Sequence, residues 1–193
     1  MKAFTHATDT QLIQFFQEGY GQALEVLINR HKDKIYSSIL FMVKDKYLAE
    51  DLFQDVFMKV IDTIRSNRYN EEGKFCPWAM RIAHNLCIDH FRKLKRNPVI
   101  KTSDDQDIFD VLNLSSESGE TIMMSTQSHH GVRTLIDMLP AEQREVLVLR
   151  HYADLSFKAI AEMTGCSVNT ALGRMRYGII NMRKMIEAKQ IAV

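Results

Sequence analysis

Two acidic residues one helical turn apart, Asp51 and Asp55, are the pair whose types and spacing first suggest chemistry. Glu50, Gln54 and Asp62 extend the same acidic side of the segment. Paired carboxylates can act as an acid and a base or bind a metal ion. Neither a histidine nor a third carboxylate stands at ligand spacing, and the sequence shows neither a glycine-rich phosphate loop nor a nucleophile motif. The sequence therefore indicates no catalytic residue, metal, cofactor or small-molecule substrate, and a docking surface for a basic partner helix is the better interpretation.

A basic helix face is the second candidate site. Five polar residues of the segment 78–96 follow at spacings of four, four, three and four and so share one side of a helix: Arg81, Asn85, Asp89, Arg92 and Arg96. His84 flanks this side and Trp78 stands near its start. Cations beside an aromatic ring suit contact with a nucleic-acid backbone and stacking on exposed bases. A solvated helix face, with Trp78 in the core, is the structural alternative.

The third candidate is a helix-turn-helix over about 156–185. Ser156 and Ser167 are suited to cap two successive helices, Gly165 to make a left-handed turn between them, and Val168 to fill the core below the second helix. The second helix would place its first residues against base edges in a DNA major groove. Gly173 and Gly178 favour this interpretation, because a helix-interior glycine suggests the close approach of a backbone, DNA included. A helical hairpin that binds nothing is the alternative.

Composition favours helices throughout. Of 193 residues, 46% are apolar and 25% are charged, the net charge is +1, and there are 8 Gly and 3 Pro, which disfavours turn-rich β folds and a disordered tail protein. Two rows predict a helix over 48–65: Leu52, Val56, Val60 and Ile64 form one, and Phe53, Phe57 and Ile61 the other. Pro77 suits a first helical turn, so the next helix is expected from 78 to about 95, with Ala79, Ile82, Ala83 and Leu86 inward.

The chain is predicted to be all-α, with two small helical domains joined by a flexible acidic linker and a helix-turn-helix in the second. The domains span 1–97 and 133–193, and the linker 98–132 is rich in Asp, Glu, Ser and Thr. The start shows no secretory signal, and no apolar run approaches the roughly 20 residues of a membrane helix. Cys76, Cys87 and Cys166 lack metal-ligand spacing and are expected to be buried and reduced in a cytoplasmic protein, without membrane insertion.

Three strings together resemble the extracytoplasmic-function (ECF) group of bacterial RNA polymerase sigma factors. They are AEDLFQDVFMKV at 49–60, WAMRIAHNLCIDHFRKLKR at 78–96 and LPAEQREVLVLRHYADLSFKAIAEMTGCSVNTALGRM at 139–175. They match region 2.2, regions 2.3 to 2.4 and region 4 in the order and spacing of that family. The resemblance covers nearly the whole chain and is more specific than one helix-turn-helix.

The resemblance implies a subunit that directs RNA polymerase core to promoter DNA, melts the −10 element and has no active site of its own. It implies that Asp51, Gln54 and Asp55 bind the polymerase clamp helices. The −10 element would be bound by Asn67, Tyr69, Asn70, Trp78, Arg81, His84, Asn85, Asp89, Arg92 and Arg96. The −35 element would be bound by Ser167, Asn169, Thr170, Leu172, Gly173, Arg174, Arg176 and Tyr177. An anti-sigma factor is a further candidate partner.

The chain departs from the family after Thr170, where Ala171, Leu172 and Gly173 replace the usual polar residues. Apolar contact with thymine methyls, or readout of DNA shape, is therefore expected there, with Arg174 and Arg176 on phosphates. Two other classes stay open at this point. A free-standing helix-turn-helix regulator would footprint DNA alone, whereas a sigma factor would bind polymerase core stably and DNA alone weakly. A structural helical adaptor would leave both basic helices without a role.

Overall fold

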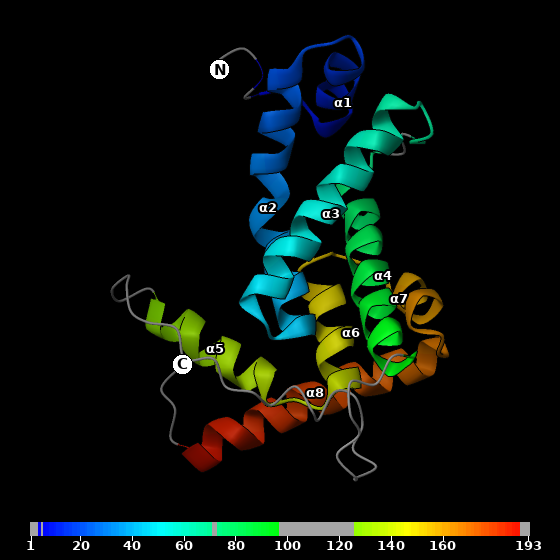
Figure 1. Ribbon diagram of the computed structural model, residues 1–193. Coiled ribbons are helices and arrows are strands. Elements are labelled where there is room, and N and C mark those ends of the chain that lie inside the picture. Colours follow the sequence, from blue (N-terminus) through cyan, green and yellow to red (C-terminus); the bar gives the residue numbers. More distant parts are fainter. Residues whose placement is uncertain (1–3, 5, 71–72, 97–125, 190–193) are drawn as a thin grey trace. The chain divides into compact units, whose positions relative to one another are not determined.

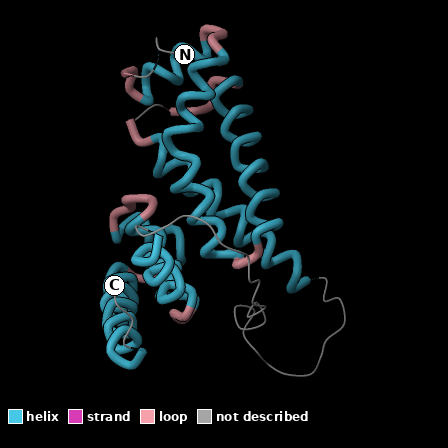
Figure 2. Tube along the Cα trace, turned by 90° about the vertical axis from the view of Figure 1, so that its left-hand side faces the viewer, coloured by secondary structure: helices cyan, strands magenta, loops and turns pink. Residues whose placement is uncertain are grey.

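A computed structural model of the chain describes residues 4, 6–70, 73–96 and 126–189. Every regular element in these ranges is an α-helix (Figure 1; Figure 2). The predicted all-α class is therefore confirmed. Within these ranges no helix is long and apolar enough to cross a bilayer.

The helices belong to two compact units. The first comprises Met1–Leu40 and Lys46–Asn97, and the second Phe41–Asp45 and Pro98–Val193. The first unit holds α1 (Asp9–Gln17), most of α2 (Gly21–Val43), α3 (Lys46–Arg65) and α4 (Phe75–Arg96). The second holds α5 (Thr126–Asp137), α6 (Ala141–His151), α7 (Phe157–Thr164) and α8 (Val168–Lys189).

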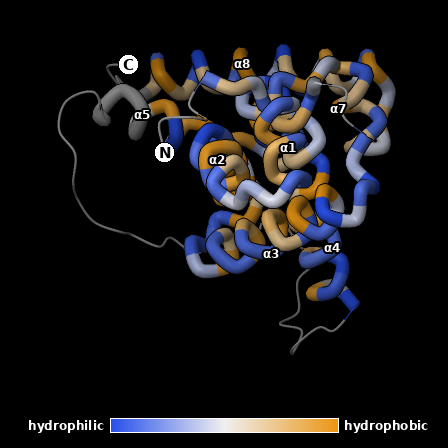
Figure 3. The backbone as a smooth tube through the Cα atoms, turned by 90° about the horizontal axis from the view of Figure 1, so that it is seen from above, coloured by the Kyte–Doolittle hydropathy of each residue, from blue (hydrophilic) through white to orange (hydrophobic). Residues whose placement is uncertain are grey.

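Helix α3 is amphipathic, as the sequence predicts. Its row Leu52, Val56, Val60 and Ile64 is buried along its length, and Phe57 is the buried member of the second row. These residues face the side where α3 packs on α4. Hydrophilic and hydrophobic residues accordingly alternate around the helices in Figure 3.

Helix α4 begins at Phe75, three residues before the predicted start. Pro77 lies in its first turn, where a missing N–H leaves no helical bond unmade, so proline does not prevent the earlier start. Ala79 and Ala83 are buried, as expected. Cys87 is buried on the same side, and burial raises the pKa of its thiol to about 12.

In the second unit α8 packs against α5, α6 and α7. Helix α5 begins at 126, inside the stretch predicted as linker up to 132, and the rest of that predicted linker lies outside the described residues. The Ser- and Thr-rich start of this helix obscured the apolar pattern that Leu135 and Ile136 continue as buried residues. Arg144 is also buried, and its Nη1 donates to the carbonyl oxygen of Asp137 at 3.0 Å. Burial lowers the pKa of this guanidinium.

Candidate functional site

The three side chains predicted to bind polymerase lie together on α3. Asp51, Gln54 and Asp55 are all exposed, while the apolar row of the helix is buried. Among the described residues, no group of three His, Cys, Asp or Glu side chains is arranged to hold a metal ion. The three side chains therefore form an exposed acidic face on α3.

Two large apolar side chains on the same side of α3 were missed in the sequence. Tyr47 is 79% exposed and Met58 is 61% exposed. The positions 47, 51, 54 and 58 follow at spacings of four, three and four, so Tyr47 and Met58 share a side with Asp51 and Gln54. Apolar anchors among exposed polar groups are typical of protein interfaces. The spacing of these positions is the sequence signal that identifies them.

The basic face of α4 is present as predicted from the spacing. All five of its residues, Arg81, Asn85, Asp89, Arg92 and Arg96, are exposed. The Nη1 atom of Arg92 lies 3.4 Å from Oδ1 of Asp89, and both side chains are largely solvent-accessible. An exposed pair of this kind contributes about 0–1 kcal/mol, so it leaves Arg92 available to a phosphate.

An aromatic cluster of Tyr69, Phe75 and Trp78 lies where the loop 66–74 joins α4. The ring centroids of Tyr69 and Trp78 are 4.4 Å apart, and that of Phe75 lies 5.9 Å from Trp78 and 6.5 Å from Tyr69. Phe75 is fully buried, whereas Tyr69 and Trp78 are half-buried. Trp78 is thus partly exposed, and its ring is held in place by packing on two other rings.

Asn67 shapes the start of this loop. It has a left-handed backbone with φ of 52°. Its N–H donates to the carbonyl oxygen of Ile64 at 3.1 Å, and the N–H of Arg68 donates to the carbonyl oxygen of Thr63 at 3.0 Å. This is the hydrogen-bond pattern of a Schellman cap on α3. Asn70 is exposed three residues later. Asn67 therefore ends α3 and directs the chain into the loop.

His84, predicted beside the basic face, does not share the exposure of that face. Its side chain is in the core, 3% exposed. It belongs to an inward row with Met80, Cys87 and Phe91, all of them buried. The spacings of four, three and four in that row were the signal in the sequence.

The helix-turn-helix is formed by α7 and α8. The Ser156 hydroxyl accepts from the N–H of Ala159 at 3.2 Å, Gly165 is left-handed with φ of 65°, and the Ser167 hydroxyl accepts from the N–H of Thr170 at 3.0 Å. These three local predictions are confirmed. Val168, expected in the core, is exposed, and Ala171 is the buried residue near the start of α8.

Most of the predicted DNA-contacting residues of α8 lie on its solvent side. Four of them are exposed: Asn169, Leu172, Arg176 and Tyr177. Gly173 is half-buried on the same side, and a Cβ built on it would meet nothing within 4 Å. The hydroxyls of Ser167 and Thr170 lie 2.8 Å apart at the exposed start of the helix. Further along the same side, Arg183 and Lys184 are exposed cations that the sequence reasoning missed.

Arg174 and Gly178 face the protein instead. Arg174 Nη2 lies 2.7 Å from Oε2 of Glu142 on α6, and its side chain is 21% exposed. A Cβ on Gly178 would lie 3.6 Å from the Cβ of Gln143 and 3.9 Å from a methyl of Leu139. The close approach at Gly178 is thus helix packing against α6, which contradicts its interpretation as a DNA contact. Both contacts join residues more than 30 positions apart, so local spacing could not reveal them.

Two family models match the chain in sequence order. The model for sigma-70 region 2 matches residues 27–97, and that for sigma-70 region 4 matches 129–171. The RNA polymerase sigma-H factor of Pseudomonas aeruginosa is 29% identical over 89% of this chain and 90% of its own length. The ECF RNA polymerase sigma factor SigW of Bacillus subtilis is 28% identical over 90% of this chain and 94% of its own. The chain belongs to the ECF sigma factors.

Two solved structures share the fold. The sigma factor RpoE of Bartonella quintana, in complex with the anti-sigma factor NepR, superposes with a TM-score of 0.61 at 16% identity over 85% of this chain and 96% of its own. CnrH, in complex with the cytosolic domain of CnrY, gives a TM-score of 0.58 at 19% identity over 93% and 97% of the two chains. At such identities the likeness establishes the all-α fold of this ECF sigma factor, and the roles of its residues must be argued from their positions.

Proposed function

We propose that this ECF sigma factor meets polymerase core, the −10 element and the −35 element through three separate surfaces. Residues 1–97 form the domain for core and −10 binding, 133–193 with the rest of α5 form the −35 domain, and the residues between them form a linker. The observation that carries the proposal is that α3, α4 and α8 each expose the polar side chains of a family motif while burying the opposite side.

The core-binding surface is the exposed side of α3. Asp51, Gln54 and Asp55 present charge and hydrogen-bond acceptors to a basic partner helix of the polymerase clamp. Tyr47 and Met58 stand at either end of this group and supply apolar contact area. An interface gains most of its affinity from a few such buried anchors, while the charges set orientation and association rate.

The −10 surface combines α4 with the preceding loop. The exposed cations of α4, Arg81 among them, bind phosphates. Trp78 and Tyr69 stack on bases that leave the DNA duplex. Melting is unfavourable unless an unstacked base gains such contacts, and stacking on an aromatic ring contributes about 1–3 kcal/mol per base. Asn70 supplies hydrogen bonds from the loop, and His84 takes no part because it is buried.

The −35 surface is the solvent side of α8. Its start carries Asn169 and Thr170, where a recognition helix meets base edges in the major groove. Leu172 and Gly173 allow close approach to thymine methyls, and Arg176 contacts phosphate. Arg174, which is paired with Glu142, orients the helix on α6 and does not contact DNA.

Nucleotide transfer belongs to the polymerase, so this role requires no active site, cofactor or small-molecule substrate in the chain. The factor acts in the cytoplasm, where its polymerase and promoters are. The similar fold of the sigma factor RpoE from Bartonella quintana was solved in complex with the anti-sigma factor NepR, which supports an anti-sigma factor as a further partner here.

Transcription from a promoter library tests the proposal. Bacterial core polymerase is supplied with DNA in which the −10 and −35 positions are randomised, with and without the purified chain. Transcripts that require the chain and come from templates sharing two separated sequence elements are expected. A chain that footprints DNA alone and adds no transcripts in the presence of core would instead be a free-standing regulator.

A further inference from the structure

Helix α1 contacts the start of the loop 66–74, although it lies outside the residues that the region 2 family model matches. The Nε2 amide of Gln17, the last residue of α1, donates to Oδ1 of Asn67 at 3.1 Å. The same amide lies 3.4 Å from the carbonyl oxygen of Ile64. Gln17 therefore holds the side chain of the residue whose left-handed backbone turns the chain out of α3.

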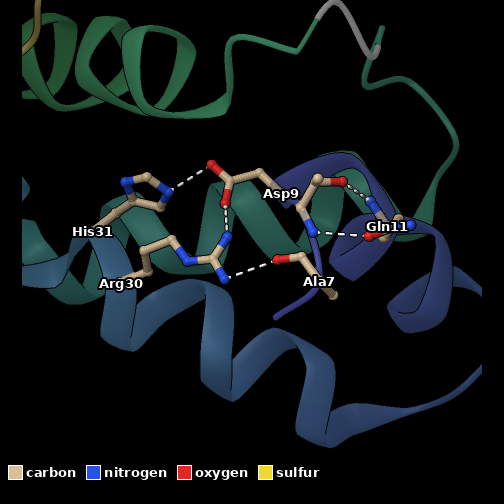
Figure 4. Close-up of polar contacts among 6 residues, drawn as sticks. Ala7, Asp9, Gln11, Arg30 and His31 are labelled. Atoms are coloured by element: carbon tan, nitrogen blue, oxygen red, sulfur yellow. Dashed lines mark hydrogen bonds and ion pairs between the residues drawn. The ribbon is translucent and has the colours of Figure 1, made fainter. Parts of the chain in front are cut away.

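The other end of the loop is linked to the first residue of α1. Asp9 accepts a hydrogen bond from Nη1 of Arg30, and its second oxygen lies 2.7 Å from Nε2 of His31 (Figure 4). The ring of His31 lies 5.3 Å from that of Phe75, which packs against Trp78 and Tyr69. The polar contact at Asp9 thus continues through the ring of His31 to Phe75 of the aromatic cluster.

Helix α1 is itself firmly placed. Thr8 and Gln11 form a reciprocal capping box at its start, and Nη2 of Arg30 donates to the carbonyl oxygen of Ala7 at 2.9 Å (Figure 4). Leu12, Ile13 and Phe16 are buried beneath it. A nine-residue helix would not be stable alone in water, so its rigidity comes from this packing and these contacts.

We propose that α1 braces the −10 recognition loop at both ends, with Gln17 and Asp9 as positioning residues. The inference rests on the proposed role of the aromatic cluster in −10 binding. A loop that must capture an unstacked base loses conformational entropy when it binds, and ordering it beforehand removes part of that cost. The brace would supply this order without any contact between α1 and DNA.

Fluorescence of Trp78 tests the brace in the full chain, because Trp78 is the single tryptophan of the sequence. Gln17→Leu removes the amide, and Asp9→Asn removes the charge while keeping the shape. The matched controls are Gln14→Leu and Glu18→Gln, which alter exposed residues of the same helix and its C-terminal cap. Acrylamide quenching of Trp78 is expected to rise in both test variants and to stay at the wild-type level in both controls.

A second readout follows the −10 element in the complex with core polymerase. The template is a promoter selected in the library experiment, with 2-aminopurine in the −10 element to report unstacking. Loss of one hydrogen bond to the loop should lower the equilibrium constant for melting about three- to tenfold, while affinity for core stays unchanged. General destabilisation would lower both together. Since Gln17 acts through Asn67, adding Gln17→Leu to Asn67→Gly should lower the equilibrium constant for melting little further.

Three results would overturn the inference. The first is Trp78 quenching and promoter melting at wild-type levels in both test variants, and the second is an equal loss of melting in the controls. The third is that the Gln17 and Asn67 changes lower melting additively. Failure of the proposed function gives a different pattern, because the wild-type chain would then direct no transcription. The Trp78 measurement would still report on the brace, since it needs neither DNA nor polymerase.

Discussion

At the scale of single residues, Gly173 offers a way to separate stability from DNA binding. An added Cβ would meet nothing within 4 Å, so Gly173→Ala should raise the free energy of unfolding by up to about 1 kcal/mol through helix propensity. If DNA approaches α8 at this position, the same change should weaken −35-dependent transcription. Thermal unfolding and transcription assays measure the two effects.

Gly178→Ala is the matched control for that change. Its Cβ would make ordinary contacts with Gln143 and Leu139 on α6, away from the solvent side of α8. It should leave transcription unchanged. Equal transcription from both variants and the wild type would show that DNA does not approach Gly173 closely.

Cys87 should be the least reactive of the three thiols. Burial raises its pKa to about 12, so the reactive thiolate is scarce in the folded protein, whereas Cys76 and Cys166 are partly accessible. Iodoacetamide at pH 8, followed by mass spectrometry, should modify Cys87 last and only after unfolding. Labelling of Cys87 as fast as Cys166 in the folded chain would contradict its burial.

The same shift predicts a loss of stability in alkali. The thiol of the unfolded chain, with an ordinary pKa of 9.0, releases its proton before the folded one does. Between pH 9 and about 12 the unfolded state therefore binds fewer protons, and the free energy of unfolding falls as pH rises. Cys87→Ala should flatten this alkaline slope in urea titrations. An identical slope in the variant would assign the loss to other groups.

Substitutions of Arg176 and Arg174 should affect DNA binding differently, although the two residues are only two positions apart on α8. Arg176 is exposed, so Arg176→Ala should weaken all promoters about equally and lower the dependence of log affinity on log salt by about 1. Arg174→Ala breaks the pair with Glu142 and should leave that salt slope unchanged. Holoenzyme binding to promoter DNA across salt concentrations measures both. A smaller slope in Arg174→Ala would place that arginine on DNA.

The residues that could be predicted are those whose role is local. Ser156, Gly165 and Ser167 cap or turn a helix through neighbours three or four positions away, and the sequence contains those neighbours. Arg174 and Asn67 have partners 32 and 50 positions away, which a periodic pattern does not contain. The buried position of His84 is readable in the sequence from its inward row, although the residue stands beside the basic face.

At the scale of elements, α3 carries a direct prediction for polymerase binding. Reversing Asp51 and Asp55 to Lys should abolish core binding while changing the free energy of unfolding by less than about 1 kcal/mol, because both groups are exposed. Asp33→Lys, a charge reversal at an exposed position of α2, is the control. A pull-down of core with the folded double variant measures the effect. Core affinity at the wild-type level would show that this face of α3 does not bind polymerase core.

The existence of the helices was more predictable than their ends. The apolar rows of α3 extend over 20 residues and identify the helix on their own. The sequence misplaces the start of α4 by three residues, because Pro77 suggests that the helix opens there whereas a proline is tolerated anywhere in a first turn. Helix α5 was missed up to residue 132 because a polar composition indicated a linker and the buried residues come only near its end.

At the scale of the whole molecule, three motifs in a fixed order identified the family from sequence, and the matches to regions 2 and 4 agree with it. The same motifs assign nothing to α1, whose link to the loop 66–74 arises from contacts across the folded unit. Sequence thus predicted which surfaces the factor presents, and the structure was needed to see what holds them in position.

Site-specific cross-linking in the initiation complex tests the assignment of the three surfaces most directly. A photoreactive amino acid replaces Met58 on α3, Asn85 on α4 or Leu172 on α8, all exposed, in a complex with core polymerase and a selected promoter. We expect cross-links from Met58 to a polymerase subunit, from Asn85 to the −10 element and from Leu172 to the −35 element. Cross-links from Asn85 or Leu172 to polymerase alone, or from Met58 to DNA, would contradict this assignment.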